Sequence, residues 1–238
     1  MRFSLMLLLL ASAAQAGELS LAVATNFQPV ATELAQHFDR LHGSTTTISA
    51  GSTGKLYAQI VNGAPYDVFL AADYDRPAKL VEDGLASHLH EYARGRLVLF
   101  SPLYEDCLAA LGGAEFRHLS IANERLAPYG AAARDWLERQ GIWQQVSRRI
   151  VRGENIGQAY LFVRTGNAEL GMVALTQMQA GAPGCRYLVP ENEHIPISQF
   201  AVTLDDSKVL AAAFIDFLQS AQARETIAKR GYTLPAGD

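Results

Sequence analysis

Apolar and polar positions alternate along the chain in two rhythms, one typical of buried strands and the other of amphipathic helices. Glu18–Ala24 is a nearly continuous apolar run, which predicts a buried strand. The next segment, Pro29–His42, repeats apolar residues at helical spacing and is followed by Gly43. It therefore predicts a helix with proline in its first turn and glycine at its end.

The same alternation continues to the end of the chain. Further strands are predicted at Thr45–Ala50, Asp67–Ala71, Arg96–Ser101 and Gly171–Leu175. Further helices are predicted at Lys55–Asn62, Pro77–Asp83 and Ala131–Gln140 and, as one or two helices, within Asp206–Lys229. Strands that alternate with helices indicate an α/β protein with mostly parallel sheets covered on both faces.

No repeat or flexible linker divides the chain, which favours two lobes joined by more than one crossing of the backbone. The crossings are predicted near Tyr92–Ala93 and near Ile197–Phe200, where an extended apolar segment follows Pro196. Residues 17–92 and 199–238 would then form the first lobe, and residues 93–198 the second.

Residues 1–16 have the three parts of a cleavable signal peptide. A basic start at Arg2 precedes the short apolar run Leu5–Leu10, and the small residues Ala14 and Ala16 follow. The apolar run is too short to span a bilayer, which takes about 20 residues. We expect cleavage near Ala16, export to the periplasm and no embedding in the membrane.

Charge and cysteine content limit the partners and the compartment that we expect for the protein. The chain carries 24 acidic and 20 basic residues, a net charge of −4, and no basic stripe, so we expect no nucleic-acid partner. Two cysteines, Cys107 and Cys185, suit an oxidising compartment, and one disulfide is favoured over two free thiols. Two cysteines alone do not make a zinc site.

Two strand-to-helix junctions carry small polar residues. Thr25 and Asn26 precede the first helix, and Ser52 and Thr53 stand between two glycines before the second. The free N–H groups at a helix start favour anions. However, Ser, Thr and Asn are also the preferred helix caps, so a purely structural role remains open for each junction.

Catalytic motifs fail at the glycine-flanked junction. A phosphate-binding P-loop needs glycine five positions before Gly54, where Ser49 stands, and a Ser or Thr after the lysine, where Leu56 stands. A hydrolase elbow needs Gly-x-Ser-x-Gly, but Gly51 directly precedes Ser52. No histidine has an evident nucleophile or carboxylate partner, so the sequence predicts no enzyme.

Two further turns precede helical stretches in the second half. Leu126–Ala131 combines proline, tyrosine and glycine, and Gly153–Gln158 is a second glycine-bounded turn. Backbone N–H groups at such turns can point outward, but neither turn carries a decisive side chain.

Together these segments resemble the periplasmic molybdate-binding proteins, the capture subunits of molybdate ABC transporters. The resemblance covers nearly all of the chain after residue 16, and it rests on the order and spacing of several short motifs. These motifs are ATNF at Ala24–Phe27, GSTGKLYAQI at Gly51–Ile60, APYDVFLAAD at Ala64–Asp73, LAPYGAAA at Leu126–Ala133, GENIGQA at Gly153–Ala159 and GYTLP near the end.

The resemblance implies a type II periplasmic binding protein fold, whose two lobes close over an oxyanion held by neutral hydroxyls and backbone N–H groups. Carried onto this sequence, the contacts fall on Thr25, Asn26 and Ser52 in the first lobe, with Thr53 a weaker candidate. In the second lobe they fall on the backbone N–H groups of Tyr129 and Ile156.

One position departs from the family pattern. Many relatives place a tyrosine hydroxyl in the site from the strand that here reads Gly171–Ala174, and this sequence has Ala174 at the expected position. Our hypothesis is that the Tyr129 hydroxyl replaces it. The alternative is that the changed wall selects a different oxyanion.

The resemblance therefore predicts capture of molybdate, and of tungstate, by a monomer that passes it to the membrane subunits of an ABC transporter. No cofactor and no directly bound metal is expected, since the metal arrives as its oxyanion. The alternatives are another tetrahedral oxyanion such as sulfate and, in another class, a periplasmic hydrolase that uses Ser52 or a histidine.

Overall fold

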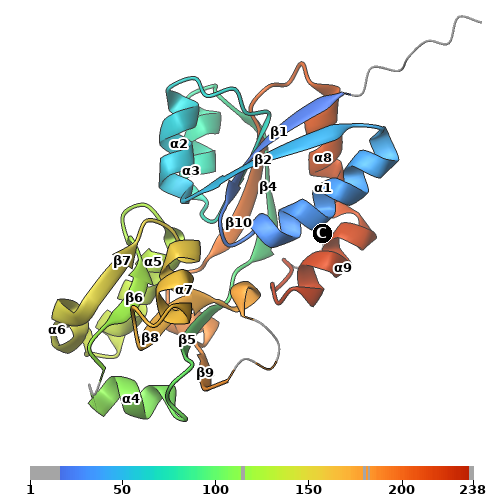
Figure 1. Cartoon of the computed structure of the whole chain (residues 1–238). Helices are drawn as coiled ribbons and strands as arrows, with labels where there is room; N and C mark the ends of the chain where they lie inside the picture. The colour runs from blue at the N-terminus through green and yellow to red at the C-terminus, as the bar shows by residue number, and fades with distance from the viewer. Residues whose placement is uncertain (1–16, 114–115, 179–180, 182, 236–238) are drawn as a thin grey trace, which may run out of the picture.

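The protein folds into two α/β lobes (Figure 1). The structure, a computed structural model, describes residues 17–113, 116–178, 181 and 183–235. The predicted signal peptide, residues 1–16, lies outside the described residues. In the described part of the chain, no helix is long and apolar enough to cross a membrane.

The first lobe is built on a five-stranded sheet of order β2-β1-β3-β10-β4. Its strands are β1 (Glu18–Ala24), β2 (Thr45–Gly51), β3 (Val68–Ala71), β4 (Ser87–Arg94) and β10 (Ser198–Thr203). Its helices are α1 (Gln28–His42), α2 (Thr53–Val61), α3 (Asp75–Glu82), α8 (Val209–Gln219) and α9 (Ala221–Lys229).

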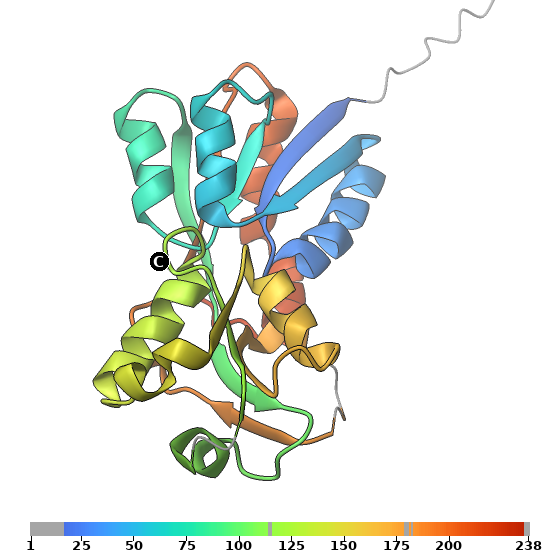
Figure 2. The same ribbon diagram turned by 60° about the vertical axis from the view of Figure 1, so that its left-hand side comes forward.

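Side chains of β1 point alternately to two cores, as the pleat of a strand requires. Leu21 and its odd-numbered neighbours pack with Phe38 of α1 and Phe214 of α8. Ala22 faces the opposite side of the sheet, where Leu56 of α2 and Leu80 of α3 cover it. Helices on both faces bury the sheet, and they leave the ends of its strands to face the second lobe (Figure 2).

The second lobe repeats this plan with a sheet of order β7-β6-β8-β5-β9. Its strands are β5 (Leu97–Ser101), β6 (Leu119–Ala122), β7 (Ile150–Gly153), β8 (Leu170–Ala174) and β9 (Cys185–Leu188). Its helices are α4 (Cys107–Gly113), α5 (Pro128–Arg139), α6 (Trp143–Val146) and α7 (Ile156–Arg164), with 3-10 turns at Ser147–Arg149, Leu175–Gln177 and Glu191–Glu193. Trp136 of α5 is buried on one face, and Val163 of α7 on the other.

Both sheets are mixed, whereas the sequence predicts mostly parallel ones. β1 pairs in parallel with β2 and β3, but β10 runs antiparallel to β3 and β4. In the second sheet β6 pairs in parallel with β7 and β8, and β5 runs antiparallel to β8 and β9. Each of these two strands, β5 and β10, directly follows a crossing between the lobes. The chain therefore enters the sheet from the side of the other lobe, and the strand runs antiparallel to its neighbours.

Two crossing segments lie side by side between the lobes. The chain leaves the first sheet after Arg94 and enters the second at Leu97, close to the crossing predicted near Tyr92–Ala93. The return crossing precedes β10, and Gly95 donates its N–H to the carbonyl of Ile197 at 2.9 Å. Cys107 and Cys185 form a disulfide that ties the start of α4 to the start of β9.

Candidate functional site

Four segments that are distant in the sequence line one small cavity between the lobes. Residues 24–26 and 51–53 line it from the first lobe, and residues 127–129 and 155–156 from the second. The positions taken from the family pattern, Thr25, Asn26, Ser52, Tyr129 and Ile156, are all among them. The fold therefore brings together the five residues that the sequence nominated.

Ser52 presents the clearest side-chain donor of the cavity. It is the residue before α2, is 3% exposed, and has an extended backbone with no hydrogen bond from its side chain to the helix. Its Oγ is buried and has no partner within the described protein. A buried hydroxyl without a partner is costly unless a ligand satisfies it, so this side chain does not act as an ordinary cap.

Helices α2, α5 and α7 begin at the cavity, and their first residues supply backbone N–H donors. Tyr129 is the second residue of α5 after Pro128, and Ile156 is the first residue of α7. The first N–H groups of a helix lack an intrahelical acceptor and carry its partial positive charge. The N–H groups of Tyr129 and Ile156 from the second lobe thus meet the start of α2 from the first.

The side chain of Asn26 is already engaged. Its Nδ2 donates to Gln199 Oε1 at 2.7 Å and to the Tyr232 hydroxyl at 2.9 Å. The backbone carbonyl of Asn26 accepts from the Tyr232 hydroxyl at 2.9 Å and from the Thr176 hydroxyl at 3.2 Å. The side chain therefore fixes the loop after β1, and the backbone N–H is what Asn26 has left to offer an anion.

Thr25 and Thr53 also have partners within the protein. The Thr25 hydroxyl donates to the Gly51 carbonyl at 2.9 Å, so its single proton is committed to the neighbouring junction. Thr53 Oγ1 accepts the N–H of Ala72 at 3.2 Å, which ties α2 to the end of β3. The Thr25 proton is thus committed and Thr53 is tied to Ala72 as an acceptor, whereas the Ser52 hydroxyl has no partner within the described protein.

The Tyr129 hydroxyl does not lie where our hypothesis about the missing tyrosine requires. A Cβ built on Gly95 would stand 2.2 Å from it, so the hydroxyl lies against the crossing segment. Neither Gly95 nor Arg96 lines the small cavity. The ring packs in the interior of the second lobe, where Ala174 is also buried. The geometry therefore does not support a direct bond from this hydroxyl to the anion.

The electrostatics of the cavity are those of a neutral donor site. No residue that lines it carries a formal charge. Burial raises the pKa of Tyr129 well above its usual value, so the phenol stays neutral. Across the described residues, no group of three or more His, Cys, Asp or Glu side chains is placed to hold a metal ion. The arrangement suits a small anion surrounded by N–H and O–H donors.

Sequence reasoning missed the residues that hold Asn26 in place. Gln199 lies 173 residues away from it in the sequence and Tyr232 lies 206 residues away. Tyr232 belongs to the GYTLP motif, which is part of the family pattern but carries no local signal for a contact with the first loop. Thr176 reaches the same carbonyl from the second lobe.

Comparisons with known proteins show the family of this chain. Residues 19–233 match the model of the bacterial extracellular solute-binding proteins. The molybdate-binding protein ModA of Azotobacter vinelandii is 44% identical over 95% of this chain and 94% of its own length. The ModA of Rhodobacter capsulatus is 41% identical over 94% of this chain and 91% of its own length. The chain belongs to the molybdate-binding family of solute-binding proteins.

Two solved structures share the fold of this chain. The periplasmic molybdate-binding protein of Azotobacter vinelandii superposes with a TM-score of 0.87 at 39% identity, over 92% of this chain and all of that one. The sulfate-binding protein SubI of Mycobacterium tuberculosis reaches a TM-score of 0.72 at 14% identity, over 91% of this chain and 86% of its own. At that identity the likeness shows the solute-binding fold alone.

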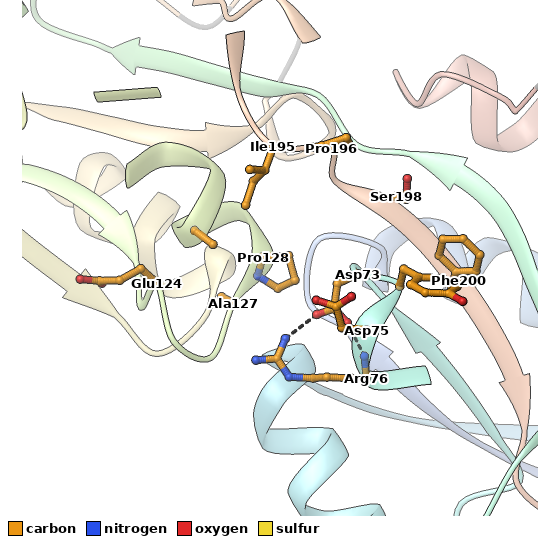
Figure 3. A pocket seen from close by; sticks show the side chains of 12 residues that line it. Asp73, Asp75, Arg76, Glu124, Ala127, Pro128, Ile195, Pro196, Ser198 and Phe200 are labelled. Atoms are coloured by element: carbon orange, nitrogen blue, oxygen red, sulfur yellow. Dashed lines mark hydrogen bonds and ion pairs between the residues drawn. The ribbon is translucent and has the colours of Figure 1, made fainter. Parts of the chain in front are cut away.

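A larger pocket of about 570 Å³ adjoins the small cavity (Figure 3). It shares Ala127 and Pro128 with the cavity, and its other walls carry Asp73 and Arg76 from the first lobe and Pro196 from the return crossing. Burial is the largest influence on the Asp73 carboxyl and raises its pKa, although Arg76 acts in the opposite direction. This pocket contains charged groups, unlike the cavity beside it.

Proposed function

We propose that the protein binds molybdate, and the isostructural tungstate, in the small cavity between its lobes. The observation that carries the proposal is the buried Ser52 hydroxyl, which has no protein partner and stands among the starts of three helices. The molybdate-binding relatives, at 44% and 41% identity over nearly the whole chain, support the choice of anion.

Neutral donors are sufficient for this task. About six charge-assisted hydrogen bonds at about 1.5–3 kcal/mol each give about 9–18 kcal/mol before costs. Desolvation of the anion and closure of the lobes oppose this sum, which leaves room for a binding free energy near about −8 to −12 kcal/mol, or micromolar to nanomolar affinity.

A cavity lined by donors also selects among oxyanions. Monohydrogen phosphate carries a proton that needs an acceptor, and a buried O–H without one is penalised. Sulfate has no such proton, so its rejection depends on the width of the cavity and the longer metal–oxygen bonds of molybdate. Sulfate is therefore the competitor that tests the proposal most severely.

The surroundings of Ser52 favour binding over catalysis. No histidine or carboxylate lines its cavity, so Ser52 lacks the base that would activate it as a nucleophile. A hydrolase would need such a pair within hydrogen-bond reach. We infer a capture protein that needs no cofactor and releases its ligand unchanged.

We further propose that the protein acts as a monomer in the periplasm and delivers the anion to the membrane subunits of an ABC transporter. The signal-like residues 1–16 support export, and the periplasmic relative of known structure supports the location. Mass spectrometry of the protein recovered from the periplasm of a Gram-negative host should give a chain that begins near Gly17.

Thermal unfolding against a panel of oxyanions tests the proposed ligand. Molybdate or tungstate at about 100 times its dissociation constant should add about 2.7 kcal/mol to the free energy of unfolding. Sulfate and phosphate at the same concentration should leave the melting temperature nearly unchanged. A shift with sulfate and none with molybdate would assign the site to the other anion.

A further inference from the structure

The loop that precedes α5 is held by two hydrogen bonds from the first lobe. Gly54, the second residue of α2, donates its N–H to the carbonyl of Leu126 at 2.8 Å. Arg76 donates its Nη2 to the carbonyl of Arg125 at 2.9 Å. Two consecutive carbonyls of the second lobe are therefore bound by the first lobe, three and four residues before Tyr129.

The same loop is fixed from its other side by its own lobe. The N–H groups of Leu126 and Ala127 donate to the carbonyl of Asn123, and the N–H of Arg125 donates to the Asn123 side chain. The backbone N–H groups of the loop thus donate within the second lobe, while the carbonyls of Arg125 and Leu126 accept from the first lobe. Its position decides where the N–H of Tyr129 points.

Arg76 is itself held in place for this bond. Asp73 accepts the backbone N–H of Arg76 at 3.1 Å through Oδ1 and forms an ion pair with Nη1 through Oδ2 (Figure 3). Their side chains are 28% and 17% exposed, so the pair is shielded from solvent on most sides. Nη1 of the planar guanidinium donates to Asp73, which leaves Nη2 to donate to the carbonyl of Arg125.

The close approach at this point also depends on Gly54. A Cβ at this position would lie 3.1 Å from the Leu126 carbonyl oxygen and 3.2 Å from Arg76 Nη2. A side chain at this position would crowd these atoms, so glycine eases the close approach of the two backbones. The contact lies beside the solute cavity, since Thr53 and Ala127 line that cavity on either side of it.

We propose that Arg76, held by Asp73, is a latch that keeps the second lobe closed over the bound anion by gripping the carbonyl of Arg125. It is a positioning residue that does not touch the ligand. This inference rests on the proposed function, because it concerns how long the bound anion is retained. An open protein can admit the anion without this bond, so the latch acts on release and leaves capture unchanged.

Release and capture of molybdate should therefore respond differently to Arg76→Met, which keeps the aliphatic stem and removes the donors. We expect the dissociation rate of preloaded radiolabelled molybdate, chased with excess unlabelled molybdate, to rise about tenfold, equal to about 1.4 kcal/mol. The association rate should change less than about twofold. The ligand-free variant should lose some stability, because Asp73 loses its partner, but should still unfold cooperatively above the assay temperature. Asp73→Asn, which releases the guanidinium, should raise the dissociation rate in the same direction.

Two control variants separate the latch from general effects of charge. Arg125→Ala keeps the carbonyl that Arg76 grips, and so it should release molybdate at the wild-type rate. Lys55→Met removes the exposed ion pair with Glu154 that also joins the lobes, with side chains 56% and 66% exposed. Exposed pairs contribute little, so this change should alter the rate less than about twofold.

The outcomes distinguish this inference from the function on which it rests. Wild-type protein that retains no molybdate would overturn the proposed function and the latch with it. Wild-type retention combined with an unchanged dissociation rate in Arg76→Met would overturn the latch alone. Equal acceleration by Lys55→Met and Arg76→Met would also overturn it, because the effect would then belong to net charge.

Discussion

The hydroxyl of Tyr232 and the carbonyl of Asn26 lie 2.9 Å apart, joining the C-terminal segment to the loop that follows β1. The Asn26 side chain returns a hydrogen bond of the same length to the same hydroxyl. One phenol thus binds both the side-chain amide and the backbone carbonyl of a buried residue that lines the small cavity. Tyr232, near the C-terminus, thus helps to position the loop after β1 that lines the cavity.

Tyr232→Phe should weaken both the fold and the site. The substitution leaves the Asn26 side-chain amide with Gln199 as its acceptor, and leaves the Asn26 backbone carbonyl with the Thr176 hydroxyl as its donor. The loss of a buried hydrogen-bond partner costs about 1–3 kcal/mol. Urea unfolding should show this loss without ligand, and calorimetry should show weaker molybdate binding. Tyr66→Phe, which removes an exposed bond to Gln59, is the matched control and should change neither quantity by more than about 0.5 kcal/mol.

Ser52 and Thr53 are adjacent hydroxyls with opposite expected roles. Ser52→Ala should weaken molybdate binding by about 1.5–3 kcal/mol, the value of a hydrogen bond to a charged group, while stability without ligand stays unchanged or rises. Thr53→Val should instead lower stability by about 1–3 kcal/mol, since it removes the acceptor for the Ala72 N–H. Parallel calorimetric and urea titrations would contradict this division if Ser52→Ala cost stability and spared affinity.

Tyr129→Phe tests whether the Tyr129 hydroxyl binds the anion in place of the tyrosine that the family pattern expects at Ala174. The hydroxyl lies against Gly95 and has no partner within the described protein, so its removal should leave molybdate affinity within about 0.5 kcal/mol of the wild type. A loss of about 1.5–3 kcal/mol in a calorimetric titration would restore the hypothesis that this hydroxyl binds the anion.

The local parts of this account could be predicted from the sequence, and the long-range parts could not. The junction around Ser52 was identified because glycines and a hydroxyl before a helix form a short, contiguous signal. Gln199 and Tyr232 were missed because their contacts with Asn26 depend on how distant strands pair. β4 was also missed, because this edge strand is half exposed and its residues SHLHEYAR lack a continuous apolar run.

The direction of the Tyr129 side chain could not be predicted for a related reason. A tyrosine at the start of α5 could be placed near the anion by its backbone alone. The direction of its ring depends on the space around Gly95 and Ile197, two residues of different crossing segments. The sequence indicated the helix start that supplies the N–H, but the packing at the crossings decided where the hydroxyl went.

Alkaline pH should destabilise the protein through three buried phenols. Burial raises the pKa of Tyr92, Tyr129 and Tyr232 above the ordinary value, so the folded state keeps protons that the unfolded chain releases above about pH 10. Stability is therefore complete below pH 10 and is lost as the pH rises further, by up to about 1.4 kcal/mol per pH unit for each tyrosine. Unfolding in urea between pH 9 and 11.5 measures this slope.

Tyr92→Phe provides the control for the alkaline prediction. The Tyr92 hydroxyl is buried and has no partner within the described protein, so the substitution should be tolerated at neutral pH. It should reduce the alkaline slope by about 1.4 kcal/mol per pH unit. A slope that is unchanged in this variant would show that the loss of stability comes from other groups.

The central claim is that the neutral cavity around Ser52 takes molybdate in preference to other oxyanions. Isothermal calorimetry of the purified protein with molybdate, in buffer that already contains millimolar sulfate, tests it most directly. We expect saturable binding of one molybdate per chain with a dissociation constant of about 1 µM or below, equal to about −8 kcal/mol or stronger. Binding abolished by the sulfate, or no molybdate binding in its absence, would contradict it.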